Sequence, residues 1–240
     1  LFRSVKTYSD KISLVRNSRG VYCIDTVMGC SSGMARTEGG CYGDCYSARA
    51  ARRYGIDFSK SICRDFKSEH HKQQILSQIA NVKMPFIRIG ASGDPSEDWD
   101  HTFKILQTLR HCNTELVIIT RHWNLLTPEQ LNQLERMNIC INSSVSALDN
   151  PEEIDRSLRQ FERIKAHCKS VLRVVSCDFN TENEIGRKLA TVQKLLFMNS
   201  PTIDTVFRPS KSNAFVTSGA VNVAKHFFNG TKQLASKHNR

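Results

Sequence analysis

The chain has 240 residues, 40% of them hydrophobic and 24% charged, which is enough apolar material for one sizeable core and argues against intrinsic disorder. No run of about 18 apolar residues occurs, so the sequence predicts no membrane-spanning helix. The formal net charge of +11 fits either a polyanionic partner, such as nucleic acid or a phosphorylated compound, or a generally basic surface.

The cysteine content points to a reducing compartment. The nine cysteines are odd in number and irregularly spaced, which is not the pattern of a secreted disulfide framework. We therefore expect a cytoplasmic protein. We also expect a single domain over residues 1–240, with an insertion around residues 59–82 and a basic C-terminal helix or tail over residues 218–240.

Segments rich in β-branched residues alternate with amphipathic segments along most of the chain. The former predict strands over residues 20–27, 84–92, 116–121, 138–146, 171–176 and 205–209. The latter predict helices over residues 44–54, around 103–109, over 128–136 and 151–167, around 185–196, and over 220–228.

Six successive strand-then-helix units predict an α/β fold with a parallel sheet and helices outside it. The order suits an open doubly wound sheet or a partial barrel, and in both architectures ligands bind where the strands end. Polar residues recur at these ends, after five successive strands. They include Ser92, Asp94, Arg121, Ser144, Ser146, Asn180 and Arg208.

Three cysteines lie in a glycine-rich stretch directly after the first predicted strand. Ten residues separate Cys30 from Cys41, and three separate Cys41 from Cys45. Such loops suit an iron-sulfur cluster or zinc, because the backbone can approach the metal and donate N–H groups to sulfur. No fourth ligand at zinc-like spacing is obvious, so we favour iron with an open position. The alternative is three buried, reduced cysteines that act as small apolar side chains.

With these features in place, residues 21–209 resemble the radical S-adenosylmethionine (radical SAM) superfamily. Residues 45–48, Cys-Tyr-Ser-Ala, are similar to the Cys-Tyr-Ala tail after the third cluster cysteine of that family. Residues 92–95, Ser-Gly-Asp-Pro, resemble its Gly-Gly-Glu-Pro segment, which holds the SAM amine. Residues 144–149 resemble its Ser-Leu-Asp segment beside the ribose, and Asn180 with Glu182 resembles another polar position.

Two features depart from the family pattern. The family places three and then two residues between its cysteines, whereas this loop is lengthened. Asp94 also stands where the family has Glu, so the presumed ligand of the amine is one methylene shorter.

The resemblance implies a partial (β/α)6 TIM-like barrel in which Cys30, Cys41 and Cys45 hold a four-iron four-sulfur (4Fe-4S) cluster. An electron donor such as flavodoxin or ferredoxin would reduce the cluster. SAM bound at the open iron would then be cleaved to a 5'-deoxyadenosyl radical, which abstracts hydrogen from the substrate. Cys177 is the candidate catalytic hydrogen donor. The implied SAM-binding residues are Ser92, Gly93, Asp94, Arg121, Ser144, Ser146, Arg173 and Asn180.

Two other classes of function remain open at this stage. A non-catalytic iron-sulfur or zinc protein with a basic nucleic-acid-binding surface would explain the charge and the cysteines, but not the polar residues at successive strand ends. An ordinary barrel enzyme using Asp94 and His101 as acid-base groups would leave the cysteine loop unexplained.

Overall fold

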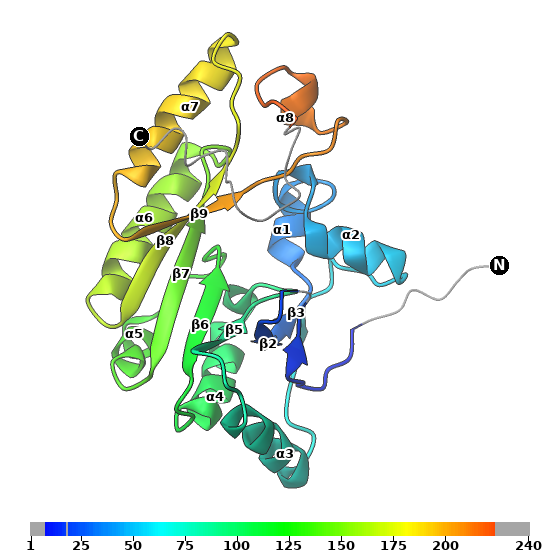
Figure 1. The fold of residues 1–240 in the computed structure, drawn as a ribbon, viewed down its shortest axis with the longest axis vertical. Coiled ribbons are helices and arrows are strands. Elements are labelled where there is room, and N and C mark those ends of the chain that lie inside the picture. The colour runs from blue at the N-terminus through cyan, green and yellow to red at the C-terminus, as the bar shows by residue number, and fades with distance from the viewer. Residues whose placement is uncertain (1–7, 18, 224–240) are drawn as a thin grey trace, which may run out of the picture.

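The computed structural model describes residues 8–17 and 19–223 (Figure 1). The fold is α/β, built on a mostly parallel seven-stranded sheet. The strands stand in the order β1-β2-β5-β6-β7-β8-β9, and β1 alone in this sheet runs antiparallel to its neighbour. Their bounds are β1 Val15–Arg16, β2 Tyr22–Ile24, β5 Phe86–Ile89, β6 Glu115–Thr120, β7 Ile139–Val145, β8 Lys169–Ser176 and β9 Thr202–Val206. A second small sheet pairs β3 (Val27–Met28) with β4 (Ile62–Cys63).

Helices follow most of the strands, and several begin after residues that cap the N-terminus of a helix. Thr127 and Asn150 form capping boxes before α5 and α6, each followed by a proline in the first turn, where a missing N–H costs nothing. The α-helices are α1 Ser31–Arg36, α2 Tyr46–Arg53, α3 Glu69–Ala80, α4 Trp99–Leu109, α5 Pro128–Leu134, α6 Pro151–Lys165, α7 Glu184–Phe197 and α8 Ala214–Thr217. Two short 3-10 helices are η1 (Cys41–Gly43) and η2 (Pro95–Glu97).

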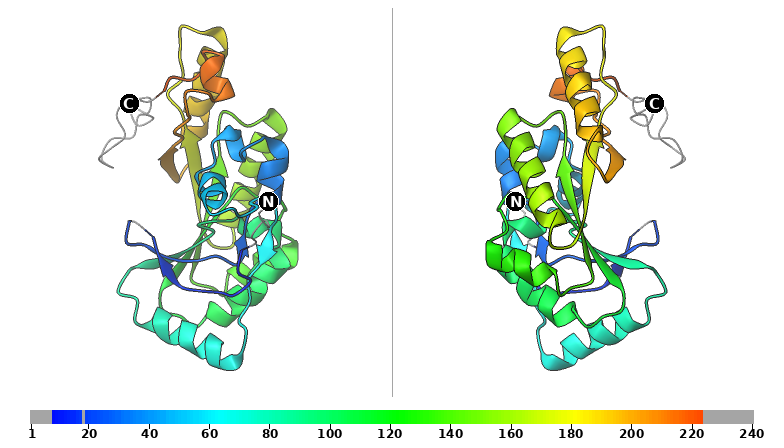
Figure 2. Two further views of the ribbon diagram at one scale, coloured as in Figure 1. Left: turned by 90° about the vertical axis from the view of Figure 1, so that its right-hand side faces the viewer. Right: turned by 90° about the vertical axis from the view of Figure 1, so that its left-hand side faces the viewer.

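The main core lies between one face of the sheet and the helices. Alternate strand residues such as Ile89, Ile118 and Ile141 are fully buried there, packed with residues of α3, α4 and α5. Figures 1 and 2 show α4 to α7 on this side of the sheet, and α1 and α2 on the other side.

The opposite face of the sheet is less covered. It carries the intervening residues of the strands, since side chains alternate between the two faces. Several of these are only half-buried: Arg88, Val117, Ile119, Val171, Arg173 and Val175. A parallel sheet usually buries both of its faces. This face instead leaves several side chains, two of them arginines, partly accessible to solvent or to a ligand.

The predicted strands and helices recur with shifted bounds, with three differences. The first predicted strand divides into β2 and β3, and the last lies earlier, at β9. The helix predicted over residues 220–228 is wrong where it can be compared: residues 220–223 are not helical, and Val221 instead bridges Phe179, while residues 224–228 lie outside the described residues. The chain forms α8 before this point, after the capping residue Asn213.

The segment predicted as an insertion, residues 59–82, contributes β4 and α3, and α3 places Ile75 and Ile79 in the main core. Most of the predicted C-terminal tail lies outside the described residues. Within residues 8–17 and 19–223, no helix combines the length and the apolar character needed to cross a bilayer.

Candidate metal centre

The three cysteines of the glycine-rich loop each stand at the start of a short helix. Cys30 precedes α1, Cys41 begins η1 and Cys45 precedes α2. Between them, Tyr42 adopts a φ of 60°, which is uncommon for a residue other than glycine. Backbone in such regions persists only when the surrounding contacts hold it, and it is concentrated at functional sites.

Two glycines leave the space that the cysteine side chains occupy. A Cβ atom on Gly33 would stand 2.8 Å from Cys30 Sγ and 3.3 Å from Cys41 Sγ. A Cβ atom on Gly40 would stand 2.7 Å from the Cβ of Cys45. The Cys30 and Cys41 sulfurs therefore both border Gly33, and Cys45 borders Gly40.

The electrostatics of the loop disfavour thiolates unless a cation is bound. Burial raises the pKa of the Cys41 thiol to about 11, with Cys45 as a nearby contributor and Arg121 opposing. Burial also raises the pKa of Cys30, helped by Asp94 and Cys41 and opposed by the Gly33 amide, which donates to the sulfur. A metal cation reverses this balance, because a coordinating thiol is deprotonated outright.

Within the described part of the chain, no three His, Cys, Asp or Glu side chains form a group that could hold a metal ion as they stand. The candidate metal ligands at the loop are the three thiols, and the Gly33 amide donates a hydrogen bond to the Cys30 sulfur.

Two buried hydrogen-bond donors beside the cysteines lack an acceptor among the described residues: Arg121 Nε and Trp123 Nε1. The Trp123 ring reaches to 3.6 Å from the ideal Cβ position on Gly33, and the Arg121 guanidinium lies 5.2 Å from the centre of that ring. A buried donor without a partner costs about 1–3 kcal/mol. A bound anionic group at this place would give both donors an acceptor.

Glu97 anchors the first turn of α1 next to Cys30. Its carboxylate accepts hydrogen bonds from the Ser32 amide (2.9 Å) and from the hydroxyls of Ser31 and Ser61, and Cys30 Sγ lies 3.5 Å from Oε1. Negative charge is favourable at a helix N-terminus. Sequence reasoning did not single out Glu97, because its partners lie more than 30 residues away along the chain.

A buried carboxylate, Asp149, ties the cysteine loop to the sheet. Its Oδ1 accepts hydrogen bonds from Arg121 Nη2 (2.6 Å), the Tyr42 hydroxyl (2.7 Å) and Arg36 Nη1 (2.9 Å). Its Oδ2 accepts from the Ser146 amide at 2.7 Å. Burial alone would raise the pKa of Asp149, but Arg121, Tyr42 and Arg36 hold it below its usual value.

Asp94, the predicted ligand of the SAM amine, is buried and already accepts several hydrogen bonds. Thr120 Oγ1 donates to Oδ1 at 2.7 Å, and the Arg121 amide donates to Oδ2 at 2.8 Å. The amide and hydroxyl of Ser96 also donate to Oδ1. Asp94 is thereby the N-cap residue of η2. Burial raises the pKa of Asp94 despite these donors. Its role toward an amine stays a prediction.

The neighbouring predicted residues, Ser92 and Gly93, make backbone contacts. The Ser92 amide donates to Asp25, and its carbonyl accepts from the Gly29 amide at 3.1 Å. A Cβ atom on Gly93 would stand only 2.2 Å from the Val27 carbonyl oxygen, so the segment before η2 packs directly against the start of the cysteine loop.

The remaining predicted residues divide between two places. Ser144 accepts from Arg173 Nη1 at 3.3 Å on the opposite face of the sheet. Ser146 donates to the Val175 carbonyl, and Asn180 donates to the Gly219 carbonyl, so both have protein partners.

Cys177, the predicted hydrogen donor, is 1% exposed and packs in an apolar cluster that includes Tyr42 and Phe179. Burial raises its thiol pKa. His101 is the predicted acid-base partner of Asp94. Its Nε2 atom is 2.7 Å from the Arg64 carbonyl oxygen.

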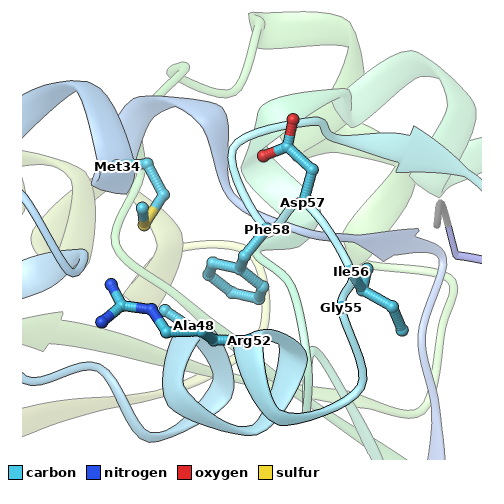
Figure 3. Close-up of a pocket in the computed structure, with 7 residues that line it drawn as sticks. All are labelled: Met34, Ala48, Arg52, Gly55, Ile56, Asp57 and Phe58. Carbon is cyan, nitrogen blue, oxygen red and sulfur yellow. The ribbon is translucent and has the colours of Figure 1, made fainter. Parts of the chain in front are cut away.

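A pocket of about 280 Å³ opens beside α2 and adjoins the cysteine loop. Figure 3 shows the side chains of Met34 and Phe58 both directed toward α2, which carries Ala48 and Arg52. Met34 is itself part of the cysteine loop, and its sulfur is 3.6 Å from the ideal Cβ position on Gly40.

No protein-family model matches this sequence, and no curated protein matches it either.

Proposed function

We propose that the chain is a radical SAM enzyme. The observation that carries the proposal is the gathering of Cys30 and Cys41 at Gly33, beside two buried donors that lack an acceptor in the described chain. The strand order supports it: β2, β5, β6, β7, β8 and β9 are neighbours in the same order in which they follow one another along the chain. This order is compatible with a partial (β/α)6 TIM-like barrel, which forms part of the proposal.

In this proposal Cys30, Cys41 and Cys45 hold three irons of a 4Fe-4S cluster, and the fourth iron binds SAM. The cluster would supply the electron for reductive cleavage of SAM, the step that starts radical chemistry on the substrate.

The protein's own part is to bind, orient and shield. Arg121 Nε and Trp123 Nε1 would donate to the anionic groups at the site, which removes the cost of leaving them unpaired. Glu97 holds the start of α1, and Asp149 holds Arg36 and Tyr42, so both ends of the cysteine loop are fixed. The buried surroundings of Cys30 would keep water away from the reacting groups.

The reducing partner would approach beside Cys45. Helix α2, which follows this cysteine, exposes Arg49, Arg52 and Arg53. A positive surface of this kind favours an acidic electron donor such as flavodoxin or ferredoxin.

Cluster assembly tests the proposal. The full chain, reconstituted anaerobically with iron and sulfide, should bind about four irons, and adding SAM should change the electron paramagnetic resonance spectrum of the reduced cluster. Cys41→Ala should lose the cluster, and Cys112→Ala, at a half-buried cysteine after α4, should keep it. Equal iron content in both variants would refute the assignment. A stable cluster whose electron paramagnetic resonance spectrum does not change when SAM is added would instead support a non-catalytic iron-sulfur protein.

A further inference from the structure

Trp123 carries a buried N–H group that has no acceptor in the part of the chain that the structure describes. Its Nε1 atom is closed off from solvent and makes no hydrogen bond among residues 8–17 and 19–223. The chain's other tryptophan shows the usual arrangement, since Trp99 Nε1 donates to the Asn124 carbonyl at 2.8 Å. An unpaired buried donor costs free energy, so the Trp123 indole calls for an acceptor other than these residues.

The indole edge that carries this N–H borders two cysteine sulfurs. The ideal Cβ position on Gly33 lies 3.6 Å from Cζ2 of the Trp123 ring. The same point lies 2.8 Å from Cys30 Sγ and 3.3 Å from Cys41 Sγ. In an indole ring, Cζ2 is bonded to the carbon that carries Nε1, so the N–H group lies on the edge near these sulfurs. Trp123 also packs against the apolar cluster that contains Cys30.

The Trp123 ring is held in this position by contacts on its backbone and on its face. Its amide donates to the hydroxyl of Ser96 at 2.8 Å, and Ser96 is fully buried in η2. The Arg121 guanidinium lies over the ring, 5.2 Å from its centre, and is itself fixed by the ion pair with Asp149 at 2.6 Å. A side chain locked by such packing can direct its N–H to one place.

The surroundings of Cys30 show what such a donor would do. Glu97 Oε1 lies 3.5 Å from Cys30 Sγ, and a carboxylate disfavours added negative charge at the sulfur. The Gly33 amide has the opposite effect, because it donates to the same sulfur. Reduction of an iron-sulfur cluster adds negative charge, and hydrogen bonds to its sulfurs are one of the factors that set its reduction potential. A further N–H donor here would stabilise the reduced form.

We propose that the Trp123 indole N–H donates a hydrogen bond to a sulfur of the 4Fe-4S cluster, on the side of Cys30 and Cys41, and thereby raises the reduction potential of the cluster. On reduction the cluster gains one electron from the reducing partner, and the indole keeps its proton. The inference rests on the cluster of the radical SAM proposal. It does not require SAM to be bound or cleaved.

Trp123→Phe tests the proposal, because phenylalanine keeps an aromatic ring and lacks the N–H group. The full chain is reconstituted anaerobically with iron and sulfide, and its midpoint potential is measured without SAM by electron paramagnetic resonance during a reductive titration. At a fixed potential, the ratio of reduced to oxidised cluster should fall about tenfold, which corresponds to a midpoint lower by about 59 mV. Trp99→Phe is the matched control and should keep the wild-type midpoint, since its N–H donates to the Asn124 carbonyl.

Two further measurements separate this hydrogen bond from a purely structural role of the ring. Electron-nuclear double resonance of the reduced cluster in H2O and in D2O detects exchangeable protons coupled to it. Trp123→Phe should lose one such coupling that the wild type and Trp99→Phe retain. Without the cluster, Trp123→Phe should keep the wild-type urea midpoint, because it removes a donor that has no acceptor among the described residues.

The proposal would be overturned by an unchanged midpoint in Trp123→Phe, by a lower midpoint with the proton coupling retained, or by a variant that folds but no longer assembles the cluster. Failure of the wild type to assemble a cluster would overturn both this proposal and the radical SAM proposal. Failure of the radical SAM proposal alone gives a different result. The midpoint would then still shift in Trp123→Phe, while the spectrum of the wild-type cluster would not respond to SAM.

Discussion

Arg121 Nη2 and Asp149 Oδ1 lie 2.6 Å apart in a buried ion pair that joins the end of β6 to the turn after β7. The same carboxylate oxygen accepts from Tyr42 and Arg36, which belong to the cysteine loop and to α1. One carboxylate thus fixes the loop on the sheet. Removing one member of such a group leaves the others charged and unpaired, which costs more than the pair itself contributes.

Asp149→Asn should lower the free energy of unfolding by about 3–5 kcal/mol, because Arg121 would be left as a buried, uncompensated charge. Urea denaturation at neutral pH measures this. Glu153→Gln is the matched control: Glu153 contacts Arg36 at 2.8 Å near the surface, and glutamine can still accept at the α6 capping box. It should lose less than about 1 kcal/mol. A loss for Asp149→Asn no greater than for the control would contradict the role of Asp149.

Gly33→Ala should separate stability from metal binding. Alanine favours helix over glycine by about 1 kcal/mol, so α1 itself would not suffer. Its Cβ atom, however, would stand 2.8 Å from Cys30 Sγ and would displace that thiol. We expect a large fall in iron bound after reconstitution with little change in the urea midpoint. Ser32→Ala, one position earlier in α1, should bind iron normally; normal iron binding by Gly33→Ala would show that the glycine is not needed for space.

His122 should make the protein acid-sensitive. Burial lowers its pKa from 6.5 to about 3, with a further contribution from Arg156, and Nε2 lies 2.8 Å from Ser143 Oγ. Between these two pH values, the His122 imidazole is therefore protonated in the unfolded chain and neutral in the folded chain. The contribution of His122 is fully present above pH 6.5 and declines as the pH falls toward 3, which amounts to about 2 kcal/mol between pH 7 and pH 5.

Urea denaturation of the wild type and His122→Asn at pH 7, 6 and 5 tests this. Asparagine tolerates the positive φ of 54° at this position, so it suits the backbone. The variant should lose less stability on acidification than the wild type. Parallel pH profiles would show that His122 is not the responsible group.

The sequence predicted the regular part of the fold because that part is periodic. Apolar spacing along α6 and the β-branched run of β6 follow the two periods that define helix and strand. By contrast, β2, β3 and β4 have two or three residues each, which is too few to show a period. In addition, β3 pairs with β4, a strand that is distant from it in the sequence. Helix α1 was missed because its third residue is Gly33 and its N-cap residue makes no side-chain cap.

The site was predictable where it depends on neighbouring residues and not where it depends on distant ones. The cysteine loop could be recognised from its glycines and its position after a strand. The pairing of Arg36 with Asp149 joins residues 113 apart, and that of Ser32 with Glu97 joins residues 65 apart, so neither follows from local spacing. Strand alternation predicted Cys177 on the same face as Arg173, and the apolar cluster that holds Cys177 packs against Val175 of that face and contains Tyr42 of the cysteine loop.

The most direct test of the radical SAM proposal is the release of 5'-deoxyadenosine from SAM by the reconstituted, reduced full chain under anaerobic conditions. We expect the product from the wild type and from Cys112→Ala, and none above background from Cys41→Ala. Wild-type protein that carries its full complement of iron yet releases no more 5'-deoxyadenosine than Cys41→Ala would contradict the proposal.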